Sequence, residues 1–212
     1  MKVAVIADGQ FPRTAYPKYL ISSADRVVCC DGALQTLEKH GISPDAVVGD
    51  MDSVCGRALR RYRGKVIKDD DQETNDLTKA VRFSLEEWDD IEELHIIGAT
   101  GRSEAHTIAN VSLLYEYEKS FSLEERGIKL DMVSDYSSIF CLNDSAELHI
   151  GKGRRISLFS LDPWLTIKSN GLKWPLDEVV FDSWWKASLN VASEDVVKLD
   201  FSKRAGVIVV LD

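Results

Sequence analysis

Apolar runs alternate with amphipathic segments through the first two-thirds of the chain, and this alternation constrains the fold most. Most runs are continuously apolar, as in strands of a parallel sheet that is covered on both faces. Between them, apolar residues recur at helical spacing. The alternation predicts an α/β fold with a doubly wound, mostly parallel sheet and helices on both faces. The expected strands are Val3–Ala7, Arg26–Cys30, Ala46–Val48, Lys65–Ile67, Glu93–Ile97 and Lys129–Val133, and the expected helices are Gly32–His40, Asn75–Trp88 and Thr107–Lys119.

The pattern changes after about Tyr136, where short strand-like segments follow one another with turn residues between them. Because no long helical pattern fits this part, it predicts an antiparallel β-sandwich or a small barrel. We therefore expect two domains, an α/β domain over residues 1–136 and a β-sandwich domain over residues 137–212. The expected strands of the second are Ser138–Leu142, Ala146–Ile150, Arg155–Ser160, Leu165–Ser169, Glu178–Phe181, Val196–Phe201 and Gly206–Leu211.

The composition excludes some classes of protein. The chain has a net charge of -9, so it lacks the basic surplus with which nucleic-acid-binding proteins neutralise phosphates. The first residues predict a strand rather than a signal peptide, and no apolar run is long enough to predict a membrane span. The four cysteines have no metal-ligand spacing. Reduced thiols in the cytoplasm fit them best.

Two aspartates follow the third expected strand, where the chain leaves the edge of the sheet. Asp50 and Asp52 are one residue apart within Gly49–Ser53. Ligands bind at this edge in open α/β sheets. Carboxylates at this spacing can hold one hard cation, usually Mg²⁺, which in turn holds phosphate oxygens. A plain polar turn uses the same residue types. The residues at the other strand ends are therefore needed to distinguish a metal site from a turn.

Three further polar segments follow expected strands, so the parallel topology can bring all four segments to one edge of the sheet. The last segment offers small residues and backbone N–H groups before a helix, as phosphate cradles do. His106 and Asn110 share one face of that helix, although His106 could equally be a structural histidine. The segments are Cys30–Ala33, Asp69–Asp76 and Gly98–Glu104.

The acidic segment Asp69–Asp76 favours a metal. So many carboxylates in one place would repel one another unless Asp71 and Asp76 joined Asp50 and Asp52 around a shared cation. Lys79, one helical turn beyond Asp76, could then reach a phosphate. The alternative is a solvated loop in which Asp71 or Thr74 caps the following helix.

The sequence contains no P-loop motif, no protein-kinase motifs and no nucleophile elbow, so ordinary members of those classes are excluded. In the second part, Trp184 and Trp185 are adjacent and expected in or near a strand, so their rings should face opposite ways. We expect one ring to be exposed, where it could stack on a flat cationic ligand. A position in the core is the usual alternative.

Together these elements resemble the thiamin pyrophosphokinase family over nearly the whole chain. The G-D-x-D-S element of the first part and the G-L-K-[YW]-P-L element of the second make the combination highly specific. The matching elements run in the family's order: Asp8–Pro12, Cys30–Ala33, Gly49–Ser53, Asp71–Lys79, Gly98–Asn110 and Gly171–Leu176.

The resemblance implies an enzyme that transfers a diphosphoryl group from ATP to the hydroxyethyl group of thiamin, with Mg²⁺, giving thiamin diphosphate and AMP. It implies a homodimer with active sites between the α/β domain of one subunit and the β-sandwich of the other. By match, the catalytic and metal residues are Asp50, Asp52, Asp71 and Asp76; the ATP and phosphate residues are Asp31, Gly32, Lys79, Gly98, Thr100, Gly101, Arg102, His106 and Asn110; and the thiamin residues are Trp185, Ser188 and Asn190.

The fourth element departs from the family pattern G-x-R-x-D-H-x-L-x-N. When His106 is aligned, Ser103 stands where an arginine is expected and Ala105 where an aspartate is expected. Arg102 and Glu104 each stand one residue early. Either these charged side chains still reach the positions of the expected arginine and aspartate, or a phosphate contact is weakened. Two alternatives stay open: a metal-dependent phosphohydrolase with the same carboxylates, and a non-catalytic regulator that binds thiamin or a nucleotide, which the departures at Ser103 and Ala105 keep possible.

Overall fold

A computed structural model describes residues 1–212, apart from the side chain of Leu59. Five α-helices and two short 3₁₀ helices accompany the strands. The helices are α1 (Ala15–Ser23), η1 (Asp31–Ala33), α2 (Leu34–Lys39), α3 (Gly56–Arg61), α4 (Asp76–Glu87), α5 (Glu104–Phe121) and η2 (Trp184–Ala187). The strands are β1 (Lys2–Ile6), β2 (Arg26–Cys30), β3 (Ala46–Gly49), β4 (Val66–Lys68), β5 (Glu93–Ile97), β6 (Lys129–Val133), β7 (Ser138–Leu142), β8 (Ala146–His149), β9 (Arg155–Ser160), β10 (Ile167–Asn170), β11 (Asn190–Val191), β12 (Val196–Phe201) and β13 (Val207–Leu211).

One ten-stranded sheet runs through the molecule in the order β11-β9-β13-β7-β6-β5-β1-β2-β3-β4. Strands β1 to β6 are parallel, with Ile6 paired to Cys29 on one side and to Ile97 on the other. The chain builds outward from β1 to β4 and then returns to place β5 on the other side of β1. This reversal of strand order is where open α/β sheets bind ligands.

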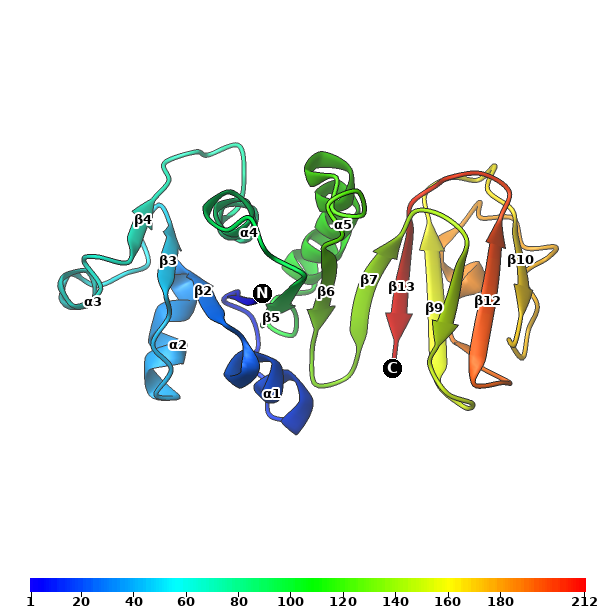
Figure 1. The fold of residues 1–212 in the computed structure, drawn as a ribbon, viewed down its shortest axis with the longest axis horizontal. Helices are drawn as coiled ribbons and strands as arrows, with labels where there is room; N and C mark the ends of the chain where they lie inside the picture. Colours follow the sequence, from blue (N-terminus) through cyan, green and yellow to red (C-terminus); the bar gives the residue numbers. More distant parts are fainter.

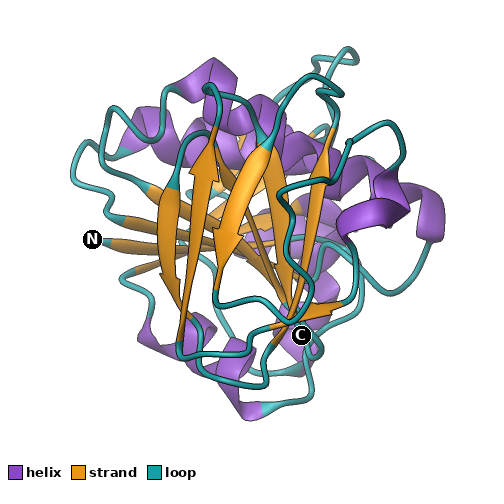
Figure 2. Ribbon diagram, turned by 90° about the vertical axis from the view of Figure 1, so that its right-hand side faces the viewer, coloured by secondary structure: helices purple, strands orange, loops and turns teal.

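The second half of the chain extends the same sheet and adds a smaller one. Strand β7 pairs antiparallel with β6, and β13 and β9 follow (Figure 1). The smaller sheet, in the order β10-β12-β8, packs against them through a shared apolar core. Figure 2 views this end of the molecule. The predicted α/β sheet followed by an antiparallel sandwich is therefore confirmed, while the division into domains at residue 136 stays a prediction.

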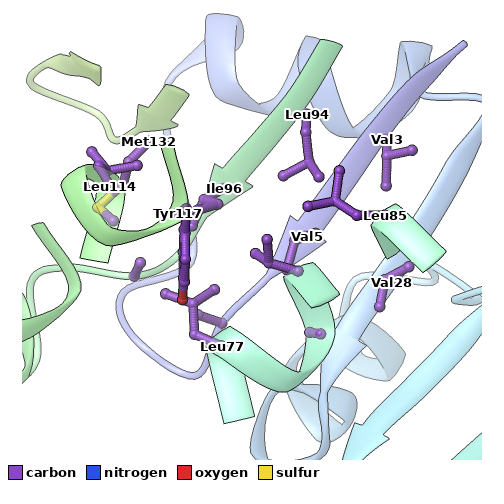
Figure 3. Close-up of a cluster of buried hydrophobic side chains, with 14 of the residues drawn as sticks. Val3, Val5, Val28, Leu77, Leu85, Leu94, Ile96, Leu114, Tyr117 and Met132 are labelled. Carbon is purple, nitrogen blue, oxygen red and sulfur yellow. The ribbon is translucent and has the colours of Figure 1, made fainter. Parts of the chain in front are cut away.

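Apolar cores lie on both faces of the parallel strands. Helices α4 and α5 cover one face and α1 and α2 the other (Figure 1). On the first face, Leu77 and Leu85 of α4 meet Val5 and Ile96 of the sheet, with Tyr117 of α5 beside them (Figure 3). None of the helices in the described part of the chain combines the length and the apolar character that a membrane span requires.

Some expected elements differ from the structure. Residues Glu178–Phe181 form no strand: a turn at Leu176–Val179 breaks the extended conformation, and Phe181 is buried in the sandwich core while Val180 is exposed. The sequence pattern also missed α1 and α3. Helix α1 buries only three residues, one of them Pro17, so its periodicity is weak.

Candidate active site

A cleft of about 410 Å³ opens at the carboxyl edge of the parallel strands, where the strand order reverses. The loops after β1, β2 and β5 and the first turns of α4 and α5 form its walls. All of its described lining residues lie between positions 7 and 110, so none comes from the sandwich. They are Ala7, Asp8, Gly9, Cys30, Asp31, Gly32, Ser53, Asn75, Asp76, Leu77, Ala99, Thr100, Arg102, Ser103, His106, Thr107 and Asn110.

Three carboxylates converge beside this cleft. Asp31, Asp50 and Asp52 each offer an oxygen, and these three atoms lie within 4.8 Å of one another. Asp31 is buried at the end of β2, whereas Asp52 is exposed. Carboxylate oxygens are the donors that Mg²⁺ prefers, so this set fits the ion that the resemblance implies.

The turn between Asp50 and Asp52 depends on two unusual backbone positions. Gly49 lacks a side chain, and a Cβ there would lie 2.8 Å from Cγ of Asp31. Met51 has a φ of 71°, in the left-handed region that few non-glycine residues adopt. Its N–H donates to Oδ2 of Asp31 at 3.1 Å. The buried carboxylate of Asp31 is thus bonded to the backbone between the two others.

Burial and hydrogen bonding act in opposite directions on the pKa values of Asp31 and Asp50. Burial, and then the negative charge of Asp76, raise the pKa of Asp31. The N–H of Asp52 donates to Oδ1 of Asp50 at 3.1 Å and lowers the pKa of Asp50. A bound cation would favour the ionised form of all three groups.

Asp71 and Asp76 lie outside this group of three, so the predicted group of four is not the one that the structure assembles. Arg82 Nη2 lies 3.7 Å from Oδ2 of Asp71, and the Glu73 N–H lowers the pKa of Asp71. Local donors thus satisfy Asp71. The alternative of a cap by Asp71 or Thr74 does not hold either, because Asn75 caps α4 by accepting from the Thr78 N–H at 2.9 Å.

Asp76 lines the cleft and pairs with a buried lysine. Nζ of Lys79 lies 3.3 Å from Oδ1 of Asp76, and the Lys79 side chain is 3% exposed. A buried ammonium group needs such a partner to be stable. Helix α4 therefore places one positive charge beside the acidic edge of the sheet.

The loop after β5 packs closely against the loop after β1. The Gly9 and Gln10 N–H groups donate to the carbonyl oxygens of Gly98 and Thr100. Gly98 has a φ of 74°, and a Cβ there would lie 2.8 Å from the Ala7 carbonyl oxygen. Glycine is required at this contact.

Helix α5 presents His106 and Asn110 to the cleft from its first turns. Asn110 Nδ2 donates to the Ala99 carbonyl oxygen at 2.8 Å, so this side chain also fixes the loop before the helix. His106 is exposed. Thr100 and Arg102 line the cleft, whereas Gly98 and Gly101 shape the loop beside it.

The residues of the fourth element that differ from the family pattern have clear local roles. Ser103 is the N-cap of α5 and accepts from the His106 N–H at 3.3 Å. Nη1 of Arg102 donates to the backbone oxygen of Asp8 at 2.9 Å and to its Oδ1 at 2.7 Å. Ala105 and Glu104 are exposed in the first turn. The cap could have been predicted, because a serine directly before a helical pattern is a capping signal. The pairing of Asp8 with Arg102 could not, because no sequence pattern links these two positions.

The predicted thiamin residues lie in the sandwich, outside the described lining of the cleft. Asn190 is 3% exposed; its Nδ2 donates to the Trp174 carbonyl oxygen at 2.7 Å, so it fixes the loop of the G-L-K-[YW]-P-L element. Ser188 donates to the Trp185 carbonyl oxygen at 2.5 Å. Trp184 and Trp185, expected in or near a strand with one ring exposed, lie in the 3₁₀ helix η2 before β11, and both are exposed.

An apolar groove of about 710 Å³, here called the α5 groove, adjoins the cleft at Thr107. Helix α5 forms one wall, and β9, β13 and the start of η2 form the other. Ile108, Leu161 and Trp184 are each more than half exposed there. The lining residues are Thr107, Ile108, Val111, Ser112, Tyr115, Glu116, Ile139, Phe159, Leu161, Asp162, Trp184, Arg204, Ala205, Gly206, Ile208 and Val210.

Known structures resemble this chain over its whole length. Thiamine pyrophosphokinase from Bacillus subtilis is 20% identical, with a TM-score of 0.78 over 100% of this chain and 99% of the other. Thiamin pyrophosphokinase from Candida albicans is 17% identical, with a TM-score of 0.77 over 99% and 89%. The yeast enzyme is 18% identical, with a TM-score of 0.78 over 99% and 85%. At these identities the likeness supports the fold. A search of curated protein sequences finds no match.

Two family models match in sequence. The catalytic domain of thiamin pyrophosphokinase matches residues 17–124, and the substrate-binding domain of thiamin pyrophosphokinase matches residues 138–208. Together they span most of the chain, in the order in which the two halves of the fold occur. The chain therefore belongs to the thiamin pyrophosphokinase family, whose members are enzymes that convert thiamin to thiamin diphosphate.

Proposed function

We propose that this chain transfers a diphosphoryl group from ATP to the hydroxyl group of thiamin, producing thiamin diphosphate and AMP. The observation that carries the proposal is the group formed by Asp31, Asp50 and Asp52 beside a cleft at the reversal of strand order. These three residues would hold Mg²⁺, which when bound neutralises phosphate charge. We thus propose Asp31 as a ligand beside Asp50 and Asp52, whereas Asp71 and Asp76, which the sequence also predicted as ligands, lie outside this group of three.

Phosphate binding is assigned to the rest of the cleft. Lys79, outside the described lining, supplies a buried positive charge beside Asp76, and Arg102 supplies a second one at the rim. Gly32 and the loop from Gly98 to Gly101 allow close approach of backbone N–H groups, as at other anion sites before helices. His106 and Asn110 would position the nucleotide from α5. Phosphoryl transfer depends mainly on such positioning and charge stabilisation.

We assign the acceptor of the thiamin hydroxyl proton to Asp76 rather than Asp71. Asp76 lines the cleft, whereas Asp71 lies outside its described lining. The Glu73 N–H and Nη2 of Arg82 already engage the carboxylate of Asp71. In-line attack by the hydroxyl group on the β-phosphorus of ATP would then release AMP.

The thiamin site and the homodimer are proposed together. Trp185, Ser188 and Asn190 lie in the sandwich, and the cleft takes its described lining from the other half of the chain. If two subunits share each site, the sandwich of one can supply thiamin contacts to the cleft of the other. We also propose the cytoplasm as the compartment, because the four cysteines are free thiols.

An assay of AMP release, with and without thiamin, tests the function. We expect AMP and thiamin diphosphate to form in equal amounts and only when thiamin, ATP and Mg²⁺ are all present. Release of inorganic phosphate without thiamin diphosphate would instead support the phosphohydrolase. Thiamin binding by calorimetry with no turnover would support the regulator.

Replacement of Asp52 tests the metal assignment. In Asp52→Asn one of the three charges is lost, and we expect the rate of AMP formation to fall on the order of 10²-fold, as for loss of one electrostatic group in other active sites. Excess Mg²⁺ should restore part of the rate. Glu147→Gln, which alters an exposed ion pair in the smaller sheet, is the control. Full activity of Asp52→Asn at low Mg²⁺ would contradict the assignment.

A further inference from the structure

We propose that Asp8 is a positioning residue that holds the guanidinium group of Arg102 at the rim of the cleft, where it binds a phosphate of the nucleotide. The inference rests on the proposed function and adds a residue to it. Asp8 and Arg102 are 94 positions apart, and both line the cleft.

The geometry of the pair leaves donors free for an anion. Both hydrogen bonds from Arg102 to Asp8 come from Nη1, at 2.9 Å to the backbone oxygen and 2.7 Å to Oδ1. Arginine carries five N–H donors in a rigid planar fork. The donors on Nη2 and Nε are therefore available to a phosphate, to which two of them can bind side by side.

Asp8 is well placed to act as an anchor because three loops of the cleft meet around it. A Cβ on Gly32 would lie 3.1 Å from Oδ2 of Asp8, so the carboxylate packs directly on the loop after β2. The next residues along, Gly9 and Gln10, are bonded to Gly98 and Thr100 of the loop after β5. The carboxylate thus lies between the loops after β2 and β5, where it accepts a hydrogen bond from Arg102.

Stability alone does not account for this pair. The side chains of Asp8 and Arg102 are 46% and 57% exposed. Ion pairs at such exposure contribute little to the stability of the fold. An unpaired Asp8 carboxylate at the cleft would also repel phosphates. When it is paired with Arg102, it instead directs the guanidinium group toward them. Binding of the nucleotide is therefore the property that the pair should control.

Four variants test the inference: Asp8→Ala, Asp8→Asn, Arg102→Ala and the double variant Asp8→Ala/Arg102→Ala. The probe is α,β-methylene ATP with Mg²⁺, whose bridging carbon prevents diphosphoryl transfer. Its dissociation constant is measured by calorimetry, together with the KM values for ATP and thiamin. Glu147→Ala is the matched control, because the Glu147–Lys198 pair is 56% and 54% exposed.

We expect Asp8→Ala to weaken binding of the analogue about tenfold, as for loss of a charge-assisted hydrogen bond. Arg102→Ala should weaken it similarly, and the double variant no further, because Asp8 acts through Arg102. Asp8→Asn keeps an oxygen acceptor for Nη1 and should retain most of the affinity. The KM for thiamin and the unfolding midpoint should not change.

Two results would overturn the inference: additive losses in the double variant, or unchanged or tighter binding in Asp8→Ala. They are distinguishable from a failure of the proposed function. If the wild-type protein releases AMP from ATP in the presence of thiamin, the function stands whatever Asp8 does. If the wild-type protein neither binds the analogue nor releases AMP, both the function and the role of Asp8 are wrong.

Discussion

At the scale of single residues, Met51 shows how the acidic turn is specified. Its left-handed backbone costs on the order of 1 kcal/mol or more in a non-glycine residue. The side chain packs against the core beneath β3, and the N–H is held by Asp31. These contacts offset the strain. The spacing of Asp50 and Asp52 could be read from the sequence, but Asp31 joins them only because β2 and β3 are neighbours.

His95 gives a prediction about pH. It lies on β5 with Nδ1 2.6 Å from Oδ1 of Asp131 and Nε2 3.3 Å from Oε2 of Glu93. Burial alone would lower the pKa of His95, but these two carboxylates outweigh it and raise the pKa above 6.5. The stabilisation is therefore fully present below the unfolded value and is lost as the pH rises through the raised pKa.

We expect Asp131→Asn to reduce the free energy of unfolding by about 1.5 kcal/mol near pH 6 and by less near pH 9. Urea unfolding across this range measures the difference between the variant and the wild-type protein. His149→Gln, on an exposed strand position, should leave the pH dependence unchanged. A difference that grows with pH would contradict this account of His95.

At the scale of elements, a helix could be predicted from the sequence when it buries several apolar residues at regular helical spacing. Helix α4 buries one continuous side and ends within a residue of the prediction at both ends. Helix α5 is longer than predicted, because it buries only Leu114 and Tyr117 and begins at the Ser103 cap. Helix α3 has six residues and follows the acidic turn. Such short elements depend on tertiary contacts more than on local pattern.

The contact between α5 and the turn before β13 gives a second prediction. A Cβ on Gly206 would lie 1.8 Å from Cε2 of Tyr115, so the ring occupies the space of a side chain. We expect Gly206→Ala to reduce the free energy of unfolding by about 1 to 3 kcal/mol through overpacking. Gly64→Ala, where nothing lies within 4 Å, should change it by less than about 0.5 kcal/mol. Equal effects, measured by chemical denaturation, would show that the ring contact is unimportant.

At the scale of the whole molecule, the order of strand and helix patterns predicted both halves of the fold but not how they join. The two registered pairs between β6 and β7 continue the sheet across the predicted boundary. Pairing of β13 with both β7 and β9 depends on contacts far apart in the sequence. The cleft was predictable from its strand-end residues, whereas the α5 groove combines distant segments that no local pattern links.

The α5 groove gives a prediction about assembly. Exposed apolar residues gathered in a groove are typical of association surfaces, and the proposed shared site requires a second copy. We expect a dimer in sedimentation equilibrium, with Trp184→Ala and Ile108→Glu weakening it at least about tenfold. Trp164→Ala is the control, because Trp164 is 82% exposed and lies outside the groove. A wild-type monomer at all concentrations would contradict the shared site.

The sheet that passes from one half of the chain to the other has a mechanical consequence. Because β6 and β7 are hydrogen-bonded neighbours, the halves cannot rotate apart about a flexible connection without breaking backbone bonds. This architecture therefore does not permit one chain to close around its substrates by a hinge movement. We expect admission and release of the proposed nucleotide to depend on smaller movements, in the loops that follow β1, β3 and β5.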